Sequence, residues 1–404
     1  MRTRVPVRVR VARALLAIAL AAAAVAAPIV AWHLTKGPGP IAKQHKVPPV
    51  VEAGVTRALD ATLPQLRAAQ ARRGVPVLTY HDVGGVGGQY SITPEQFAAQ
   101  MEALDRAGYH TISLAQFDRW QAGDKPRLPP RPILITFDDS IKSAWVDADP
   151  ILARHGFRAT MFAITGRLST HQPYYLSWEE LQRMASGGRW DVGSHTRDGH
   201  TQIVTTPHGR RGAYLTHLEW RPERGRLETL AEYRKRVSED LAGSMDDLRD
   251  HGIRPASAFA FPFSASKFPT NDPRVPDTLS QLVMGRFHVV MDNTPGAASI
   301  PASAGRRYLS RIEIVGKTST QGLLDRLGAA KPLTPVQPPS GKETVFDFLD
   351  VGSVARADLL LKDQFQLPRY KAVTIHHITW EEDPYREVYW RFNFYGLQPT
   401  VDLL

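Results

Sequence analysis

The sequence predicts an α/β protein whose main domain is a parallel sheet surrounded by helices. Short apolar, β-branched runs alternate with helical patterns from residue 75 to about residue 315, and such alternation is typical of parallel sheets. About eight candidate strands fall within roughly 240 residues, which favours a barrel over an open sheet, although periodicity alone does not choose between them. Polar residues follow three of these strands, as expected for a barrel with a site at one end.

The individual elements follow from local patterns. The candidate strands are short apolar runs: Val75–Tyr80, His110–Leu114, Ile133–Phe137, Ala159–Ile164, Trp190–Gly193, Ala258–Phe261, Phe287–Met291 and Leu309–Ile314. The candidate helices have apolar residues three or four positions apart: Pro94–Ala107, Ser143–His155, Ser177–Ala185 and Glu228–His251. A further helix is expected within residues 51–73.

Composition excludes several classes of protein. The chain has 404 residues, of which 43% are hydrophobic and 22% charged, so wholesale disorder is excluded. It has no cysteine, which excludes disulfide scaffolds, cysteine nucleophiles and Cys-ligated zinc or iron–sulfur sites. The net charge is +10, but half of it comes from five arginines in the first 35 residues. The remaining charge is too small to indicate a nucleic-acid partner.

Residues 1–35 predict a signal anchor or a signal peptide. The arginine cluster precedes the uncharged run Ala14–Trp32, which is 19 residues long. A membrane-spanning helix needs roughly 20 residues, whereas a secretory segment needs about 7–15. An uncleaved anchor at residues 14–32 is favoured over cleavage near Ala24–Ala26, and a buried helix is the third alternative. Both leading alternatives export the rest of the chain, which would be membrane-anchored or secreted.

The remaining boundaries follow from proline, glycine and apolar content. Residues 36–74 are predicted to be a linker and a short helix, and residues 75–328 the barrel. Residues 329–343 are rich in proline and predict a second linker. Residues 344–404 are long enough only for a small C-terminal module, to which we assign no role.

Candidate chemical groups lie at the ends of the first, third and fifth strands. They are His81, the adjacent pair Asp138 and Asp139, and the histidines His195 and His200. Two neighbouring carboxylates at the end of a buried strand favour a cation that neutralises them. Two imidazoles and one carboxylate can hold a divalent metal and leave positions open for water and substrate. The other carboxylate could then be a general base, and His81 an acid.

Each of these residues also has a structural alternative when taken singly. The two aspartates could cap a helix that starts near Ser143, and the histidines could be core or surface residues. Their joint placement at strand ends favours a metal site.

Three motifs then resemble a known family. They are Thr136-Phe137-Asp138-Asp139, Ser194-His195-Thr196 followed by His200, and Phe259-Ala260-Phe261-Pro262-Phe263. In this order they resemble the motifs of the polysaccharide deacetylase (NodB-homology) family, carbohydrate esterase family 4. The resemblance covers about residues 75–328. Three further features resemble the branch that de-N-acetylates poly-β-1,6-N-acetyl-D-glucosamine, an exported biofilm polysaccharide. They are the spacing of five between the histidines, the early Tyr80-His81-Asp82, and the long helix with Glu228, Tyr233, Arg236, Asp240 and Leu241.

This resemblance implies a fold, a cofactor and a set of roles. The fold would be a distorted (β/α) barrel of the NodB-homology type. The cofactor would be a divalent metal, commonly Zn²⁺, with Co²⁺, Ni²⁺ or Mn²⁺ as alternatives. The roles would be metal ligation by Asp139, His195 and His200, base catalysis by Asp138 and acid catalysis by His81. The backbone near Phe263, after Pro262, would complete an oxyanion site.

The sequence also departs from the family pattern. Ser140 and Ser264 stand where glycine is usual, and a serine is tolerated there unless positive φ is required. The third motif usually opens with an arginine that pairs with the base, whereas this chain has Ala260. Arg311 is a candidate to replace that arginine, and it would then lie at the substrate groove.

The expected activity is hydrolysis of N-acetyl groups on an extracellular N-acetylglucosamine polymer, with release of acetate. The alternatives are the same chemistry on peptidoglycan, chitin-like or O-acetylated polysaccharides, or a barrel that binds sugar without catalysis.

Overall fold

The structure is a computed structural model that describes most of the predicted barrel. The described ranges are residues 41–70, 74–85, 87–124, 126–170, 173–267, 269–293, 297–298, 308–332, 393–395 and 398–400. The predicted anchor at residues 14–32 and most of the predicted C-terminal module lie outside them. Among the described helices, none combines the length and the apolar character that a membrane crossing needs.

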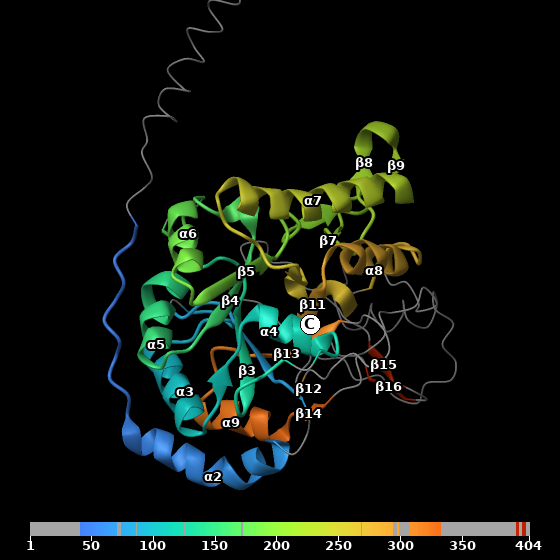
Figure 1. Cartoon of the computed structure of the whole chain (residues 1–404). Coiled ribbons are helices and arrows are strands. Elements are labelled where there is room, and N and C mark those ends of the chain that lie inside the picture. The colour runs from blue at the N-terminus through green and yellow to red at the C-terminus, as the bar shows by residue number, and fades with distance from the viewer. Residues whose placement is uncertain are drawn as a thin grey trace, which may run out of the picture. The chain divides into compact units, whose positions relative to one another are not determined.

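The central sheet is parallel and closes on itself (Figure 1). Its strands are β1 (Val77–Tyr80), β2 (His110–Thr111), β3 (Pro132–Phe137), β4 (Ala159–Ala163), β5 (Trp190–Ser194), β10 (Ala258–Ala260), β11 (Val289–Asn293) and β13 (Leu309–Glu313). The order is β1-β13-β11-β10-β5-β4-β3-β2, and β1 also pairs with β3. Within the described chain, seven strands therefore form a closed ring, and β2 extends from β3 outside it. The predicted barrel is confirmed.

Helices cover this barrel and begin at recognisable caps. They are α2 (Glu52–Gln70), α3 (Pro94–Arg106), α4 (Leu114–Gln121), α5 (Asp149–Arg154), α6 (Trp178–Ser186), α7 (Leu230–Asp250), α8 (Val275–Arg286) and α9 (Thr320–Ala329). Capping boxes at Thr93, Ser113, Ser177 and Thr229 start α3, α4, α6 and α7, because the side chains of the cap and of the third helical residue satisfy each other's backbone N–H groups. The helix expected within residues 51–73 is α2, which packs against α9 (Figure 1).

Two predicted elements need correction. The strand predicted at His110–Leu114 ends at Thr111, because Ser113 caps α4 and Leu114 already belongs to that helix. The helix predicted at Ser143–His155 starts as a π-helical segment, Ala144–Ala148, before α5. Pro150 has no N–H to donate to the carbonyl of Val146, and the backbone N–H of His45 donates to that carbonyl instead, at 2.7 Å. Helices α4, α8 and α9 were not predicted.

The barrel interior has an apolar layer below a polar one. Alternate residues of a strand face the same side, and the apolar layer includes Val77, Leu134, Phe162 and Leu309, all buried together. The residues two positions further along β1, β3 and β13 are Thr79, Thr136 and Arg311, which are fully buried. The polar layer therefore lies directly below the residues that follow these strands.

The segment between β5 and α7 folds onto α7. It contains the antiparallel pairs β6 (Gln202–Val204) with β7 (Arg211–Ala213), and β8 (Trp220–Arg221) with β9 (Arg226–Leu227). Leu215 and Leu218 are buried against α7, and the hydroxyl of Tyr233 donates to the carbonyl of Leu215 at 2.6 Å. This segment is therefore largely packed against the domain.

The last described strands are short. β12 (Ala297–Ala298) pairs with β14 (Lys331–Pro332), which falls within the predicted second linker. β15 (Asn393–Tyr395) pairs with β16 (Gln398–Thr400) in the predicted C-terminal module.

Candidate metal centre and active site

The structure brings Asp139, His195 and His200 together. Asp139 follows β3, and the two histidines follow β5. The Oδ1 atom of Asp139 lies 3.3 Å from the Nε2 atom of His195 and 3.3 Å from the Nε2 atom of His200. One donor atom from each residue lies within 4.8 Å of the other two. Three donors at this spacing could share one small cation.

The environment of these donors fits a divalent metal. Asp139 Oδ1 is buried and has no hydrogen-bond partner among the described residues. The Nδ1 atom of His195 lies 2.9 Å from the carbonyl oxygen of Ala260. A hydrogen bond to that carbonyl requires the ring proton at Nδ1 and leaves the Nε2 lone pair facing Asp139, as in metal-ligating histidines. One carboxylate and two imidazoles are also a usual zinc donor set.

Electrostatics favour the charged carboxylate. Burial raises the pKa of Asp139, but the imidazoles of His200, His195 and His81 act more strongly and hold that pKa below its ordinary value. Burial lowers the pKa of His200, whereas the Asp138 and Asp139 carboxylates outweigh burial and raise the pKa of His195. A cation would take the place of the proton that His195 attracts.

The chain enters a left-handed turn at the candidate metal centre. Asp139 has φ of 70° and Ser140 has φ of 60°, a region that costs a non-glycine residue roughly 1–2 kcal/mol. The Ser140 hydroxyl accepts the backbone N–H of Ile164 at 3.1 Å, and the Ser140 carbonyl accepts that of Leu176 at 2.9 Å. Positive φ is therefore required where the family usually has glycine, and the hydroxyl offsets part of its cost.

Asp138, which follows β3, pairs with a buried arginine on β13. In the ring, β1 lies between these two strands. The Nη1 and Nη2 atoms of Arg311, on β13, donate to Oδ1 and Oδ2 of Asp138, each at 2.8 Å. Arg311 is 0% exposed and Asp138 is 2% exposed. Burial raises the pKa of Asp138, but the Arg311 guanidinium, with His195 and His81, holds it below its ordinary value. Asp138 therefore stays ionised inside the barrel.

His81 lies after β1, at the same end of the barrel. Its ring packs against that of Tyr90 at a tilt of 39°, with centroids 4.7 Å apart, and its Nδ1 atom is buried without a hydrogen-bond partner in the described chain. The His81 imidazole helps to lower the pKa of Asp138 and the pKa of Asp139. The next residue, Asp82, instead has a structural contact, accepting the Ser143 hydroxyl at 2.7 Å.

The third sequence motif turns beside His200. Pro262 is buried, whereas Phe263 is 41% exposed and its ring lies 4.1 Å from the His200 ring. Phe263 has φ of 57° and Ser264 has φ of 53°. Like Ser140, Ser264 adopts the left-handed conformation that the usual glycine would adopt without strain.

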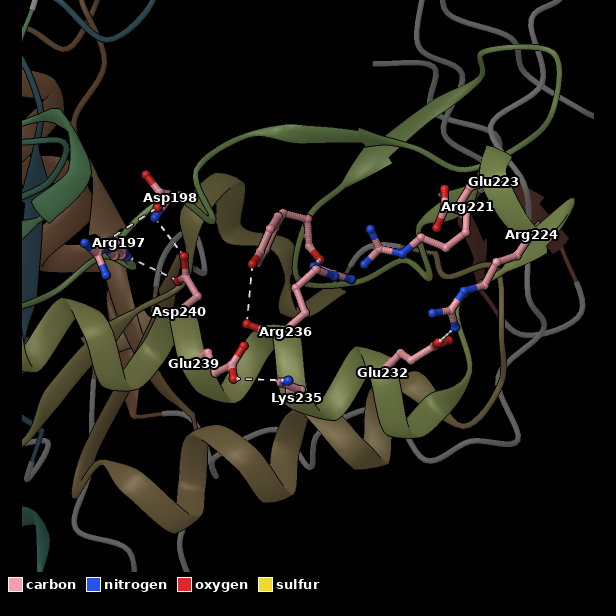
Figure 2. A pocket seen from close by; sticks show the side chains of 11 residues that line it. Arg197, Asp198, Arg221, Glu223, Arg224, Glu232, Lys235, Arg236, Glu239 and Asp240 are labelled. Carbon is pink, nitrogen blue, oxygen red and sulfur yellow. Dashed lines mark hydrogen bonds and ion pairs between the residues drawn. The ribbon is translucent and has the colours of Figure 1, made fainter. Parts of the chain in front are cut away.

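A separate cavity lies between α7 and the β8–β9 hairpin (Figure 2). Its volume is about 550 Å³, and charged side chains line it. Many of these charges pair with each other, as in the contact of 3.9 Å between Lys235 and Glu239. None of the three candidate ligands lines it, although Arg197 and Asp198 from the loop between the histidines do.

Comparison with known proteins identifies the domain. Residues 125–275 match the polysaccharide deacetylase family. The chain contains a polysaccharide deacetylase domain. The matched residues of this deacetylase domain include Asp138, Asp139 and both candidate histidine ligands, whereas His81 and Arg311 lie outside the match. The resemblance inferred from the motifs is confirmed.

Relatives of the deacetylase domain carry matching names. The poly-β-1,6-N-acetyl-D-glucosamine N-deacetylase of Staphylococcus epidermidis is 32% identical over 114 residues, which are 28% of this chain and 39% of that protein. The enzyme of the same name from Escherichia coli is 24% identical over 186 residues, which are 43% of this chain and 28% of that protein. This chain therefore spans less than half of either relative.

A solved structure supports the fold of the deacetylase domain. A de-N-acetylase from Aggregatibacter actinomycetemcomitans is 18% identical, with a TM-score of 0.51, over 62% of this chain and 99% of that one. At this identity, the likeness concerns the fold alone.

Sequence reasoning assigned no role to three groups near the site. Tyr90 and Tyr174 had no motif to mark them, and Asp240 was noted on the long helix only as part of the family resemblance, without a contact or a role. For Asp240, the available signal was a carboxylate on the apolar face of α7, one residue before Leu241.

Proposed function

We propose that this chain is a metal-dependent N-deacetylase that hydrolyses N-acetyl groups on an extracellular N-acetylglucosamine polymer. The favoured polymer is poly-β-1,6-N-acetyl-D-glucosamine, which both curated relatives carry in their names. The observation that carries the proposal is the cluster of Asp139, His195 and His200 next to the buried pair of Asp138 and Arg311. The cluster supplies the donors for a metal. The Asp138 carboxylate is ionised and would not be needed as a metal ligand.

Asp139, His195 and His200 would hold the cation. Zn²⁺ suits these donors best, and Co²⁺, Ni²⁺ or Mn²⁺ are alternatives. Once bound, a divalent cation makes water more acidic and polarises the acetyl carbonyl.

The chain's own groups would then move the protons. Asp138, kept ionised by Arg311, accepts a proton from the attacking water. The water oxygen bonds to the carbonyl carbon, and a backbone N–H near Phe263 stabilises the negative charge on the carbonyl oxygen. The C–N bond breaks as His81 donates a proton to the departing nitrogen. The products are acetate and a free amine on the polymer.

Exposed aromatic side chains support a carbohydrate substrate. Among the described residues, three of the five exposed large apolar side chains adjoin the site, namely Tyr90, Tyr174 and Phe263. The ring of Tyr90 packs against that of His81, and the ring of Phe263 against that of His200, both at a tilt. The carbonyl of Tyr174 accepts the N–H of Lys142 at 2.8 Å, and Asp139 adds to the effect of burial in raising the pKa of Tyr174 to about 12. Flat apolar rings around a polar centre suit the faces of sugar rings.

We predict that Tyr174→Ala weakens binding of a long oligosaccharide. The exposed ring, rather than its hydroxyl, would contact sugar, so KM should rise about tenfold, the equivalent of about 1.4 kcal/mol, with little change in kcat. Steady-state acetate release would measure both constants. Tyr174→Phe keeps the ring and should behave like the wild type. Equal KM values for all three proteins would exclude Tyr174 from substrate binding.

The location of the enzyme forms part of the proposal. The favoured polymer is extracellular, and the arginine-flanked run at residues 14–32 would export the barrel as an anchored or secreted domain. The expected partners are the acetylated polysaccharide and, if the segment is not cleaved, the membrane.

The proposal is tested by acetate release from defined oligomers. The purified chain with Zn²⁺ or Co²⁺ should release acetate from β-1,6-linked N-acetylglucosamine oligomers faster than from β-1,4-linked, peptidoglycan or O-acetylated substrates. Asp138→Asn should slow release about 10²–10⁴-fold while metal content stays unchanged. A preference for another polymer would correct the substrate alone. No release from any N-acetylglucosamine oligomer, with Asp138→Asn equal to the wild type, would refute catalysis and favour a sugar-binding barrel.

A further inference from the structure

The loop between the two candidate histidine ligands wraps around a carboxylate from α7. Residues 196–199 separate His195 from His200. The backbone N–H of Arg197 donates to Oδ1 of Asp240 at 3.2 Å, and that of Asp198 donates to Oδ2 at 2.7 Å. Figure 2 shows Asp240 on α7 facing these two residues. Both oxygens of one carboxylate thus bind consecutive N–H groups of the ligand loop.

Asp240 is an unusual residue for its position. It is 6% exposed, and within the described part of the chain it forms no ion pair. Burial raises the pKa of Asp240 to about 6, while the N–H groups of Asp198, Arg197 and Gly199 act in the opposite direction. A buried carboxylate without a cation is costly unless N–H donors surround it. The backbone of the loop supplies these donors.

The loop fits closely around this carboxylate. A Cβ atom at Gly199 would lie 3.2 Å from Asp240 Oδ1 and 3.1 Å from the Cβ of Thr196. Thr196 has φ of 75°, so the chain reverses directly after His195. On the other side, the N–H of Gly166 donates to the carbonyl of Arg197 at 3.0 Å. The loop is thus held on one side by the segment that follows β4 and on the other side by α7.

We propose that Asp240 is a positioning residue that holds the loop so that His200 reaches the metal. The inference rests on the proposed metal-dependent function. His200 lies only two residues after Asp198, the second residue whose N–H binds Asp240. The His200 side chain is 24% exposed, against 2% for that of His195. His195 is already fixed by its bond to Ala260. The second histidine therefore depends more on its loop, and loss of such support typically weakens metal binding about 10–100-fold.

The test is Asp240→Asn in the full-length chain. The amide oxygen can accept one N–H, but the NH₂ group would oppose the other donor. We expect Zn²⁺ affinity, measured by competition with a chelator, to fall about 10–100-fold. In metal-free protein, hydrogen exchange of the peptide that covers residues 196–200 should become faster. Gly199→Ala, which crowds the same contact from the loop side, should change both measurements in the same direction.

Two controls separate positioning from general damage. Asp246→Asn changes an exposed carboxylate of α7 that pairs with Arg249, and it should leave both measurements unchanged. Glu228→Gln breaks a buried pair with Arg236 just before α7, so it should lower the unfolding temperature without weakening Zn²⁺ binding. If Glu228→Gln weakens Zn²⁺ as much as Asp240→Asn does, or if Asp240→Asn leaves affinity and exchange unchanged, the positioning role is overturned.

The exchange measurement also separates this proposal from the proposed function. Faster exchange in metal-free Asp240→Asn, combined with a wild-type chain that binds no divalent metal, would refute the metal site itself. The same faster exchange with unchanged Zn²⁺ affinity would refute the positioning role and leave the metal site intact.

Discussion

Arg311→Met is expected to destabilise the domain by about 3–5 kcal/mol, because it leaves the buried Asp138 carboxylate without its partner. The two residues are 0% and 2% exposed and are joined by two bonds of 2.8 Å. The same change removes the cation that lowers the pKa of Asp138, so deacetylation should fall about 10²-fold or more. Denaturant unfolding and acetate release would measure the two effects.

A double substitution separates charge from packing. Asp138→Asn together with Arg311→Met removes both charges, and this pair should be more stable than Arg311→Met alone, because no unpaired ion stays buried. Its activity should stay as low as that of Asp138→Asn. If the double variant is less stable than Arg311→Met by the full cost of Asp138→Asn, the two residues do not interact energetically and our account of the pair is wrong.

His195→Ala is expected to abolish tight metal binding. The substitution removes one of three donors and leaves Asp139 Oδ1, which has no hydrogen-bond partner in the described structure, facing one imidazole. Activity should fall on the order of 10³-fold, the rate equivalent of the several kcal/mol that a Lewis acid supplies. Zn²⁺ at 100 times the wild-type dissociation constant should stabilise the wild type by about 2.7 kcal/mol and the variant hardly at all.

Thermal unfolding with and without Zn²⁺, together with metal analysis, measures this prediction. His288→Ala is the matched control, because that histidine is exposed and lies 3.4 Å from Asp118, away from the candidate ligands. It should keep the full response to Zn²⁺. Retention of bound zinc and of its stabilisation by His195→Ala would contradict the assignment of the metal centre.

Local patterns predicted much of the fold, because helices and buried strands carry their periods in the sequence. The helix predicted at Glu228–His251 is observed as α7 from Leu230 to Asp250. The strand predicted at Ile133–Phe137 is observed from Pro132 to Phe137. The prediction was wrong where a cap overrode an apolar run, as at Ser113 and Leu114. It was also wrong before Pro150, which has no backbone N–H, because the helix there begins as a wider π-helical segment.

The sequence alone determined which residues end the strands, and with them the identity of Asp138, Asp139, His195 and His200 as one candidate cluster. The motifs also carried the deacetylase resemblance. These features are local, because adjacent residues and short spacings define them.

Only the tertiary structure decided which distant groups support that cluster. Closure of the ring between β1 and β3 places Arg311 beneath Asp138, although 173 positions separate them. The packing of α7 places Asp240 against the backbone of the ligand loop. The physical reason is that a buried charge must find its partner wherever the fold provides one, and the amino-acid pattern around Arg311 or Asp240 does not specify that place.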